Sequence, residues 1–362
     1  MATTRGLESG ALTEADVGRA DAIYGASHVI DALGGSTIRR PQPSVDGKDR
    51  VDQLRDAGVT VVSETITNPG DNFHGAVLDI FDYYCLFEVT KGRTLVIQRP
   101  EDIRRAKDAG KLGIILGFQD GGPFEKELAY VPILAKLGVR ISGLAYNDSN
   151  AIGDGCFEPA NRGLTAFGKK VVLEMNRTGI TVDLSHVGER TSLDAAAVSG
   201  KPVVFSHSNA KSLTDHPRNL TDDQIRAAAQ TGGVVGICPH SVFCERERGT
   251  RPDLEAMLNH IDYIANLVGI DHVGLGTDFF GGQTLGEEVF RFKFGRMAPG
   301  FWAGYTIATK FVVGFDTMQG YKNVARGLDQ RGYKATDIQK ILGGNFLRVF
   351  EQTWPSGFPG ES

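Results

Sequence analysis

Two histidines stand at positions where their side chains could do chemistry together. His186 ends the apolar run Val-Asp-Leu-Ser-His, and His207 ends the next run, Val-Phe-Ser-His. Neutral imidazoles are common ligands of divalent metal ions, and two imidazoles on neighbouring strand ends can bind one ion. A single histidine is more often a structural residue, but the matched placement of two favours a metal site.

An aspartate and an arginine occupy comparable positions. Asp278 closes the run Val-Gly-Leu-Gly-Thr-Asp, where a carboxylate could take a proton from water or hold a metal; a helix cap is the alternative. Arg218 lies in Asp-His-Pro-Arg-Asn-Leu-Thr-Asp. A guanidinium there suits bidentate binding of a substrate carboxylate, and the alternative is an ion pair with Asp215 or Asp222.

Two further runs end in polar residues. Tyr146 and Asn147 follow one of them and could donate hydrogen bonds to a developing oxyanion. Gln119 and Asp120 follow the other, in Gly-Phe-Gln-Asp-Gly-Gly. Asp183 lies inside a buried run, and we interpret it as hydrogen-bonded support for the site.

Short β-rich runs alternate with helical patterns and must position these side chains. Because parallel strands need a crossover connection, the alternation indicates βαβ units. Eight such units close a barrel whose catalytic groups lie at the C-terminal strand ends. The sequence therefore predicts an α/β fold, a (β/α)8 TIM barrel. The predicted strands are 27–33, 58–64, 113–118, 139–146, 179–185, 202–207, 232–238 and 272–277.

The connecting segments fit helices, and no linker divides the chain. We expect one domain over residues 1–362, because there is no internal repeat, low-complexity tract or Pro/Ser linker. Aromatic-rich excursions at 68–94 and 281–311 could cover the barrel mouth or pack against the barrel wall. Helices are predicted over 49–57, 163–178, 220–230 and 253–268.

Composition narrows the classes of partner. A formal net charge of -5 gives no long-range attraction for nucleic acid or anionic lipid. No apolar stretch approaches the roughly 18 residues of a membrane span, and residues 1–20 lack a secretory signal pattern. We expect a cytoplasmic protein with a small-molecule substrate and no membrane partner. The four cysteines are too dispersed for a metal knuckle, so we interpret them as reduced thiols.

The chain resembles the membrane (renal) dipeptidase family of metallopeptidases, in the amidohydrolase superfamily. The resemblance covers most of the chain, and it implies a barrel of the metal-dependent hydrolase type that cleaves dipeptides as a homodimer. It is carried by Gly-Val-Arg-Ile-Ser-Gly-Leu-Ala-Tyr-Asn near 139–147, Asp-Leu-Ser-His-Val-Gly at 183–188, Phe-Ser-His-Ser-Asn-Ala at 205–210, His-Pro-Arg-Asn-Leu-Thr-Asp at 216–222, Gly-Leu-Gly-Thr-Asp-Phe at 274–279 and Gly-Gly-Asn-Phe-Leu-Arg-Val-Phe at 343–350.

The resemblance implies a role for each candidate. In the family, two histidines bind one metal, a His-x-Asp pair binds a second, and a glutamate bridges the two. His186 and His207 match the two-histidine half. Arg218 matches the arginine that binds the substrate carboxylate, and Asp278 matches the aspartate that transfers a proton.

Three positions depart from the family pattern. The first strand should read approximately Asp-Gly-His-x-Asp, but Leu33 and Gly35 stand where the metal ligands belong. Gln119 replaces the bridging glutamate, and Tyr146 replaces the histidine before Asn147. A bridging hydroxide between two cations is therefore not expected, which puts ordinary dipeptidase activity in question.

We therefore predict a metal-dependent hydrolase that acts on an amide or peptide-type bond in a small carboxylate-bearing substrate. One divalent metal, with Zn2+ favoured, would be held by His186, His207 and Gln119. Asp278 and Tyr146 would act in catalysis, by moving the proton and polarising the carbonyl. Arg218 and Asn147 would bind the substrate.

Three other functions are compatible with the same residues. A barrel with altered ligand positions could run a lyase, isomerase or decarboxylase step on a carboxylate substrate, because fold does not fix chemistry. A catalytically silent binding protein is a third possibility. A two-metal dipeptidase whose missing ligands lie elsewhere in the chain is the fourth.

Overall fold

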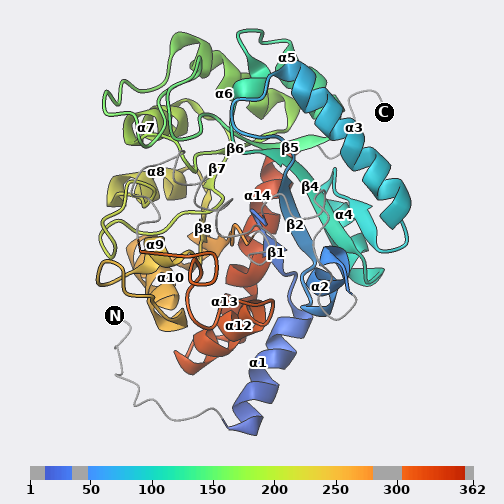
Figure 1. Cartoon of the computed structure of the whole chain (residues 1–362), viewed down its shortest axis with the longest axis vertical. Helices are drawn as coiled ribbons and strands as arrows, with labels where there is room; N and C mark the ends of the chain where they lie inside the picture. Colours follow the sequence, from blue (N-terminus) through green and yellow to red (C-terminus); the bar gives the residue numbers. More distant parts are fainter. Residues whose placement is uncertain (1–12, 35–47, 280–303, 355–362) are drawn as a thin grey trace.

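Parallel strands close into a barrel at the centre of the molecule (Figure 1). The computed structural model describes residues 13–34, 48–279 and 304–354. β1 (Ile30–Asp31) pairs with β2 (Val61–Thr65) on one side and with β9 (Val273–Leu275) on the other, which closes the circle. The predicted TIM barrel is confirmed. The strands between β2 and β9 are β4 (Leu112–Phe118), β5 (Val139–Gly143), β6 (Thr181–Asp183), β7 (Val203–Phe205) and β8 (Val234–Ile237).

A ninth strand, β3 (Thr94–Val96), lies outside this circle and was not predicted. It pairs with the first half of β4, at Leu112 to Ile114. β5 begins to pair with β4 only at Leu116. β3 therefore satisfies the backbone groups of β4 where β5 does not reach, and the barrel proper keeps its eight strands.

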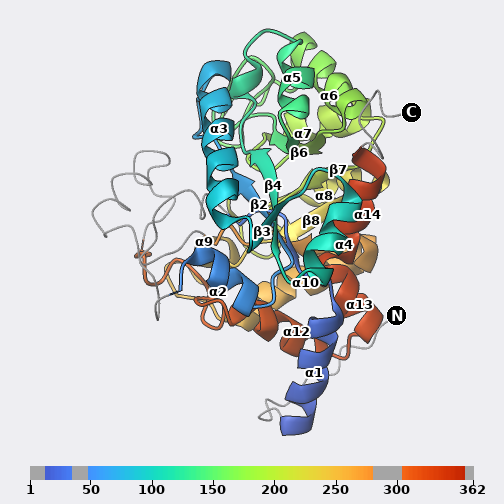
Figure 2. The ribbon, with the colours of Figure 1, turned by 90° about the vertical axis from the view of Figure 1, so that its right-hand side faces the viewer.

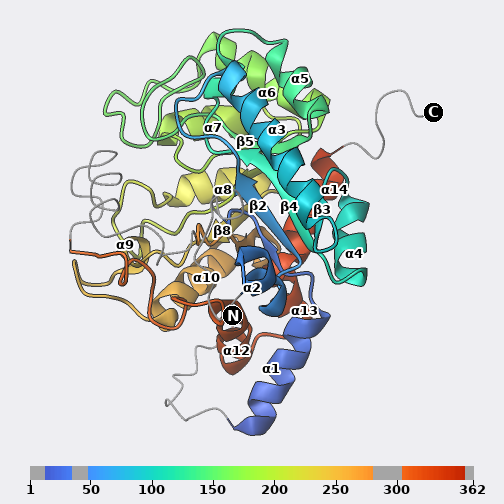
Figure 3. The ribbon, with the colours of Figure 1, turned by 45° about the vertical axis from the view of Figure 1, so that its right-hand side comes forward.

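Helices surround the barrel in the order that the sequence predicts (Figures 2 and 3). The predicted helical segments are found as α2 (Arg50–Asp56), α6 (Ala166–Thr178), α8 (Asp222–Gln230) and α10 (Leu254–Val268). The other helices of the described chain are α1 (Glu14–Ala26), α3 (Phe73–Thr90), α4 (Pro100–Asp108), α5 (Tyr130–Lys136), α7 (Glu189–Val198), α9 (Ser241–Cys244), α12 (Gly320–Gln330), α13 (Ala335–Gln339) and α14 (Asn345–Thr353). No helix among the described residues is both long and apolar enough to cross a membrane.

Local sequence signals explain where these helices begin and end. The Thr165 side chain accepts a hydrogen bond from Gly168 N at the start of α6, and Gly179 ends the helix with φ 78°. Thr221 and Gln224 form a reciprocal capping box at the start of α8. This cap fixes where the loop that carries Arg218 joins its helix.

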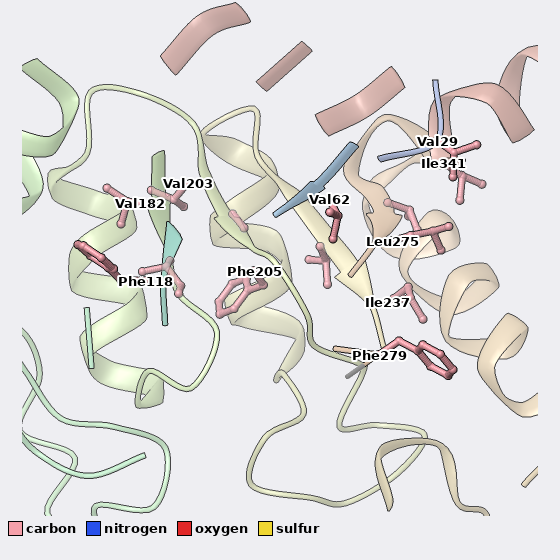
Figure 4. Packing of buried hydrophobic residues seen from close by; sticks show 14 of the residues in the cluster. Val29, Val62, Phe118, Val182, Val203, Phe205, Ile237, Leu275, Phe279 and Ile341 are labelled. Atoms are coloured by element: carbon pink, nitrogen blue, oxygen red, sulfur yellow. The ribbon is translucent and has the colours of Figure 1, made fainter. Parts of the chain in front are cut away.

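Apolar side chains fill the layer between barrel and helices, as Figure 4 shows for Val62, Phe118 and Leu275. The N-terminal end of the barrel is closed by α14 and the residue that follows it. Trp354 stacks on Phe350 at 4.2 Å and donates a hydrogen bond to Arg140 O at 3.0 Å. The opposite end, where the strands finish, is left for chemistry.

The two aromatic-rich excursions differ in what the structure describes. α3 packs along the barrel wall, where the buried Tyr83 hydroxyl donates to Glu64 Oε2 at 3.1 Å. Residues 280–303 lie outside the described residues. The segment after them is held against the loop that follows β8, since Ser241 N donates to Lys310 O at 2.7 Å and Val312 N to Pro239 O at 2.9 Å.

Replacement of Trp354 by alanine should destabilise the protein strongly. The indole is buried and closes the barrel, so its removal leaves a cavity that costs about 3–5 kcal/mol. Urea unfolding would measure the free energy of unfolding. The control Val89→Ala, at a side chain 77% exposed on α3, should change it by less than about 0.5 kcal/mol. A Trp354→Ala loss as small as that of the control would contradict the account.

Candidate active site

The two predicted histidines meet at the C-terminal end of the barrel. His186 follows β6 and His207 follows β7, and their Nε2 atoms lie 2.9 Å apart. Both residues are buried, at 6% and 0% exposure. The structure therefore brings together the pair whose placement favoured a metal site.

The opposite nitrogen of each ring is held by a hydrogen-bond acceptor. His186 Nδ1 lies 2.7 Å from Asn147 Oδ1. His207 Nδ1 lies 2.8 Å from Ser206 Oγ, and the Ser206 hydroxyl donates its own proton to Asp183 Oδ2. The Asn147 amide oxygen can only accept, and the Ser206 hydroxyl has already donated its proton to Asp183. Both Nδ1 atoms therefore carry protons.

These partners leave an electron lone pair on each Nε2 atom, and the two lone pairs face each other. Burial, and next the charge of Arg218, holds the pKa of both His186 and His207 well below the usual value, so both rings are neutral at pH 7. Two facing lone pairs repel unless a cation lies between or beside them. The donor set fits one divalent metal ion, with ring orientation fixed by the second partner of each histidine.

Gln119, the candidate third ligand, directly follows β4 at the same end of the barrel. Its Nε2 donates to Thr65 Oγ1 at 2.7 Å, so the carbonyl oxygen is the atom left to bind an ion. The neighbouring Asp120 carboxylate has other partners. It accepts from Gly70 N at 2.9 Å and from Asn150 Nδ2 at 3.0 Å, which ties two loops together.

Among the described residues, the positions expected to bind the second metal of the two-metal pattern do not form a metal site. Leu33 is buried and apolar, and Gly35 lies outside the described residues. The Asp31 carboxylate accepts from Thr277 N at 2.8 Å and from Tyr321 Oη at 2.5 Å, so it is used within the barrel wall. Over the ranges that the structure describes, no three His, Cys, Asp or Glu side chains are grouped to hold a metal.

Arg218 lies beside the histidines with hydrogen-bonding capacity to spare. Its Nη2 donates to His207 O at 3.1 Å, and its guanidinium carbon lies 5.5 Å from the Phe243 ring centroid. The buried Nε has no hydrogen-bond partner. The alternative ion pair does not form, because Asp215 and Asp222 pair with other cations. A buried guanidinium of this kind suits an anionic ligand.

Asp278 is held at the same end of the barrel by both backbone and side-chain contacts. Its N donates to Leu33 O at 2.6 Å, and its Oδ2 lies 3.5 Å from His240 Nε2. Burial lowers the pKa of His240 to about 3, so this imidazole is neutral and orients Asp278 by polar contact rather than by full charge.

Tyr146 packs against His186 and interacts with the charges of Asp278 and Arg218. Its ring stacks on His186 with centroids 4.0 Å apart. Burial, and next the charge of Asp278, raises the pKa of the Tyr146 hydroxyl, while Arg218 acts in the opposite direction. The hydroxyl therefore stays protonated at neutral pH and can donate a hydrogen bond.

Three of the site residues have left-handed backbone conformations. The φ angles are 63° at Asn147, 68° at His186 and 46° at Asp278. Such conformations cost of order 1–3 kcal/mol each for residues other than glycine, and they concentrate at functional sites. Their occurrence at three different strand ends supports the assignment of this end as the site.

A cavity of about 290 Å³ opens beside His186. Its wall includes His186, Arg218 and Cys156, and Lys211 and Glu189 contribute charged groups. A cavity of this volume can hold a small molecule. Its charged wall residues suit a molecule with both acidic and basic groups.

Sequence reasoning did not single out three residues that the structure places here. Ser206 immediately precedes His207, and only the side-chain geometry reveals its contact with Nδ1. His240 follows the predicted strand 232–238, so its position after a strand was an available signal. Lys310 lies far from any predicted strand end, and nothing in the sequence pattern marks it.

The comparison with known families agrees with this geometry. The profile of the membrane dipeptidase family, peptidase family M19, matches residues 57–292 and 294–355. The chain belongs to this family. Members of the M19 family are metallopeptidases, and membership implies a divalent metal.

Individual relatives are similar to this M19 family member along most of its chain. A dipeptidase of Claviceps purpurea, tcpJ, is 30% identical over 86% of this chain and 71% of that protein. An amidohydrolase of Pseudomonas aeruginosa superposes with a TM-score of 0.83 at 31% identity, over 92% of this chain and 99% of that one. A metallopeptidase of Rhodobacter sphaeroides, bound to a phosphinate mimic of L-Ala-D-Ala, has a TM-score of 0.75 at 21% identity over 91% and 99%, which supports the fold.

Substitution of Ser206 by alanine should weaken binding of a divalent metal by about 10–100-fold, because His207 Nδ1 loses its acceptor. Isothermal titration with a divalent metal salt would measure the dissociation constant. Ser192→Ala removes an equally buried hydroxyl that donates to Glu189 O in α7, away from both histidines. Equal affinities for the Ser206→Ala, Ser192→Ala and unmodified proteins would refute the tautomer argument.

Proposed function

We propose that this chain is a mononuclear metal-dependent hydrolase that cleaves the amide bond of a small substrate with a free carboxylate, such as a dipeptide. The observation that carries the proposal is the facing pair of Nε2 atoms at 2.9 Å beside the buried Arg218 guanidinium. Family membership favours hydrolysis over the lyase and isomerase alternatives.

His186 and His207 would hold one Zn2+, with the Gln119 carbonyl oxygen as a further ligand. A bound Zn2+ supplies Lewis acidity and a water of lowered pKa. Asn147 and Ser206 orient the two rings by accepting from their Nδ1 atoms. Asn147 therefore positions the His186 ring through its Oδ1 atom. Its amide nitrogen could in addition bind the substrate.

The remaining side chains handle the substrate. Arg218 would bind the carboxylate with its guanidinium, and the protonated Tyr146 hydroxyl would donate to the scissile carbonyl oxygen as negative charge develops on it. Asp278 would take the proton from the attacking water and deliver it to the leaving amine nitrogen. Each group performs one task, and the substrate carboxylate sets the orientation.

The proposal extends to the state of the protein in the cell. We propose a cytoplasmic, zinc-loaded homodimer that acts on a small molecule and has neither membrane nor nucleic-acid partners. The net charge of -5 supports the absence of a polyanionic partner.

A free substrate carboxylate should be required for efficient cleavage. Loss of a charge-assisted hydrogen bond costs about 1.5–3 kcal/mol, so C-terminal amidation of a dipeptide should lower kcat/KM by roughly 10–150-fold. Chromatography of products from a panel of free and amidated dipeptides would measure this, and removal of metal by a chelator should abolish cleavage.

Arg218→Ala should lower kcat/KM for free dipeptides and remove the preference over their amides. Arg226→Ala is the control, because Arg226 pairs with Asp222 and Asp223 on α8, outside the cavity. Preference for the free carboxylate that persists in Arg218→Ala would contradict the role of Arg218. No cleavage of any dipeptide by metal-loaded protein would contradict the proposed function.

A further inference from the structure

Lys310 is a lysine that the structure buries completely near Asp278. Its side chain has 0% exposure, although the residue lies in a segment without regular structure. The segment is fixed at this point, because Ser241 N donates to Lys310 O at 2.7 Å and Ser241 Oγ donates to Thr309 O at 2.7 Å. The position of the ammonium group is therefore built into the fold.

The charged and titratable groups around this ammonium come from three separate elements. Asp278 follows β9, His240 follows β8, and Arg50 begins α2. The charges of Asp278 and Arg50 act on Lys310, and Lys310 in turn lowers the pKa of His240. Lys310 Nζ also lies 4.9 Å from the centroid of the Phe311 ring. Burial lowers the pKa of Lys310 to about 7, Asp278 acts to raise it, and Arg50 acts to lower it. The Phe311 ring lies 4.8 Å from the His240 ring, and His240 Nε2 lies 3.5 Å from Asp278 Oδ2, so Lys310 and Asp278 belong to one buried cluster.

The other buried cation in this region serves different acids. Arg50 donates to Phe279 O at 2.5 Å and its guanidinium lies 5.0 Å from the Phe279 ring centroid. Its charge interacts with Glu64 and Asp31 in the barrel wall. Arg50 therefore interacts with acids of the barrel wall, whereas Lys310 interacts with Asp278, the proposed proton-transfer group.

The inference rests on the proposed hydrolytic function. A site with one metal ion has lost the positive charge that a second ion would supply on the β1 side, where Leu33 now stands. We propose that Lys310 replaces part of that charge: it is a positioning residue whose fixed ammonium attracts the Asp278 carboxylate and offsets negative charge that develops at the barrel mouth. A side chain of the protein, rather than a second metal ion, would then supply this positive charge.

A structural role and a functional role make opposite predictions for stability. A buried lysine kept for function costs stability, so its replacement by the uncharged, similarly shaped methionine should raise the melting temperature. Because the pKa of Lys310 is about 7 in the folded protein and about 10.4 in the unfolded chain, the unfolded chain binds more protons between these values. Stability of the unmodified protein should therefore rise with pH across this window relative to Lys310→Met.

The first experiment compares melting temperatures of the unmodified and Lys310→Met proteins from pH 6 to pH 9. The expected result is a higher melting temperature for Lys310→Met at pH 6 and a smaller difference at pH 9. A lower melting temperature for Lys310→Met at pH 6 identifies a structural ion pair and overturns the inference. This experiment needs no substrate, so it can overturn the inference even if no dipeptide is cleaved and the proposed function fails.

The second experiment measures dipeptide hydrolysis by metal-loaded protein. Lys310→Met should lower kcat on the order of 100-fold with little change in KM, as expected for loss of a charge that acts in the transition state. Lys310→Arg should restore most of kcat and extend activity to higher pH, because arginine keeps its charge. Lys107→Met is the control, since Lys107 also has a burial-lowered pKa but donates to Gly25 O at the end of α1. An unchanged kcat in Lys310→Met would overturn the inference.

Discussion

The facing lone pairs of His186 and His207 are the constraint on which the rest of the site depends. Each ring is turned by a partner that only accepts, so the two nitrogens that meet at 2.9 Å are both bases. The barrel must bring β6 and β7 close enough for this contact. At Gly276, after β9, a Cβ would lie 1.6 Å from Ser206 O, so only glycine lets the backbone pass behind His207.

Buried cationic side chains lie close to this pair and to Asp278. Arg218 lies against His207 and Phe243, and its buried Nε has no partner. Lys310 is buried on the side of Asp278, whose backbone N donates to Leu33 O. Buried cations are costly to keep, and a site that holds the Arg218 guanidinium beside two neutral imidazoles is suited to an anionic substrate.

The sequence predicted the parts of this arrangement that depend on periodicity. Eight apolar runs gave the strands, and the residues that end them, His186, His207 and Asp278 among them, are brought to one end of the barrel because parallel strands share a direction. β3 was missed because three residues, Thr-Leu-Val, carry no periodic signal of their own. Lys310 was missed because its position depends on how an irregular segment packs on the loop after β8. The contacts of Ser206 and Asn147 with the histidines depend on side-chain geometry that no sequence pattern encodes.

Metal content per chain tests the central claim most directly. Elemental analysis of protein purified without chelator should give about one equivalent of divalent metal, since the histidine pair provides one site. The double variant His186→Ala, His207→Ala should give none. Two equivalents would show that ligands for a second ion exist in the chain after all, and the absence of metal from the unmodified protein would contradict the account of a metal-dependent site.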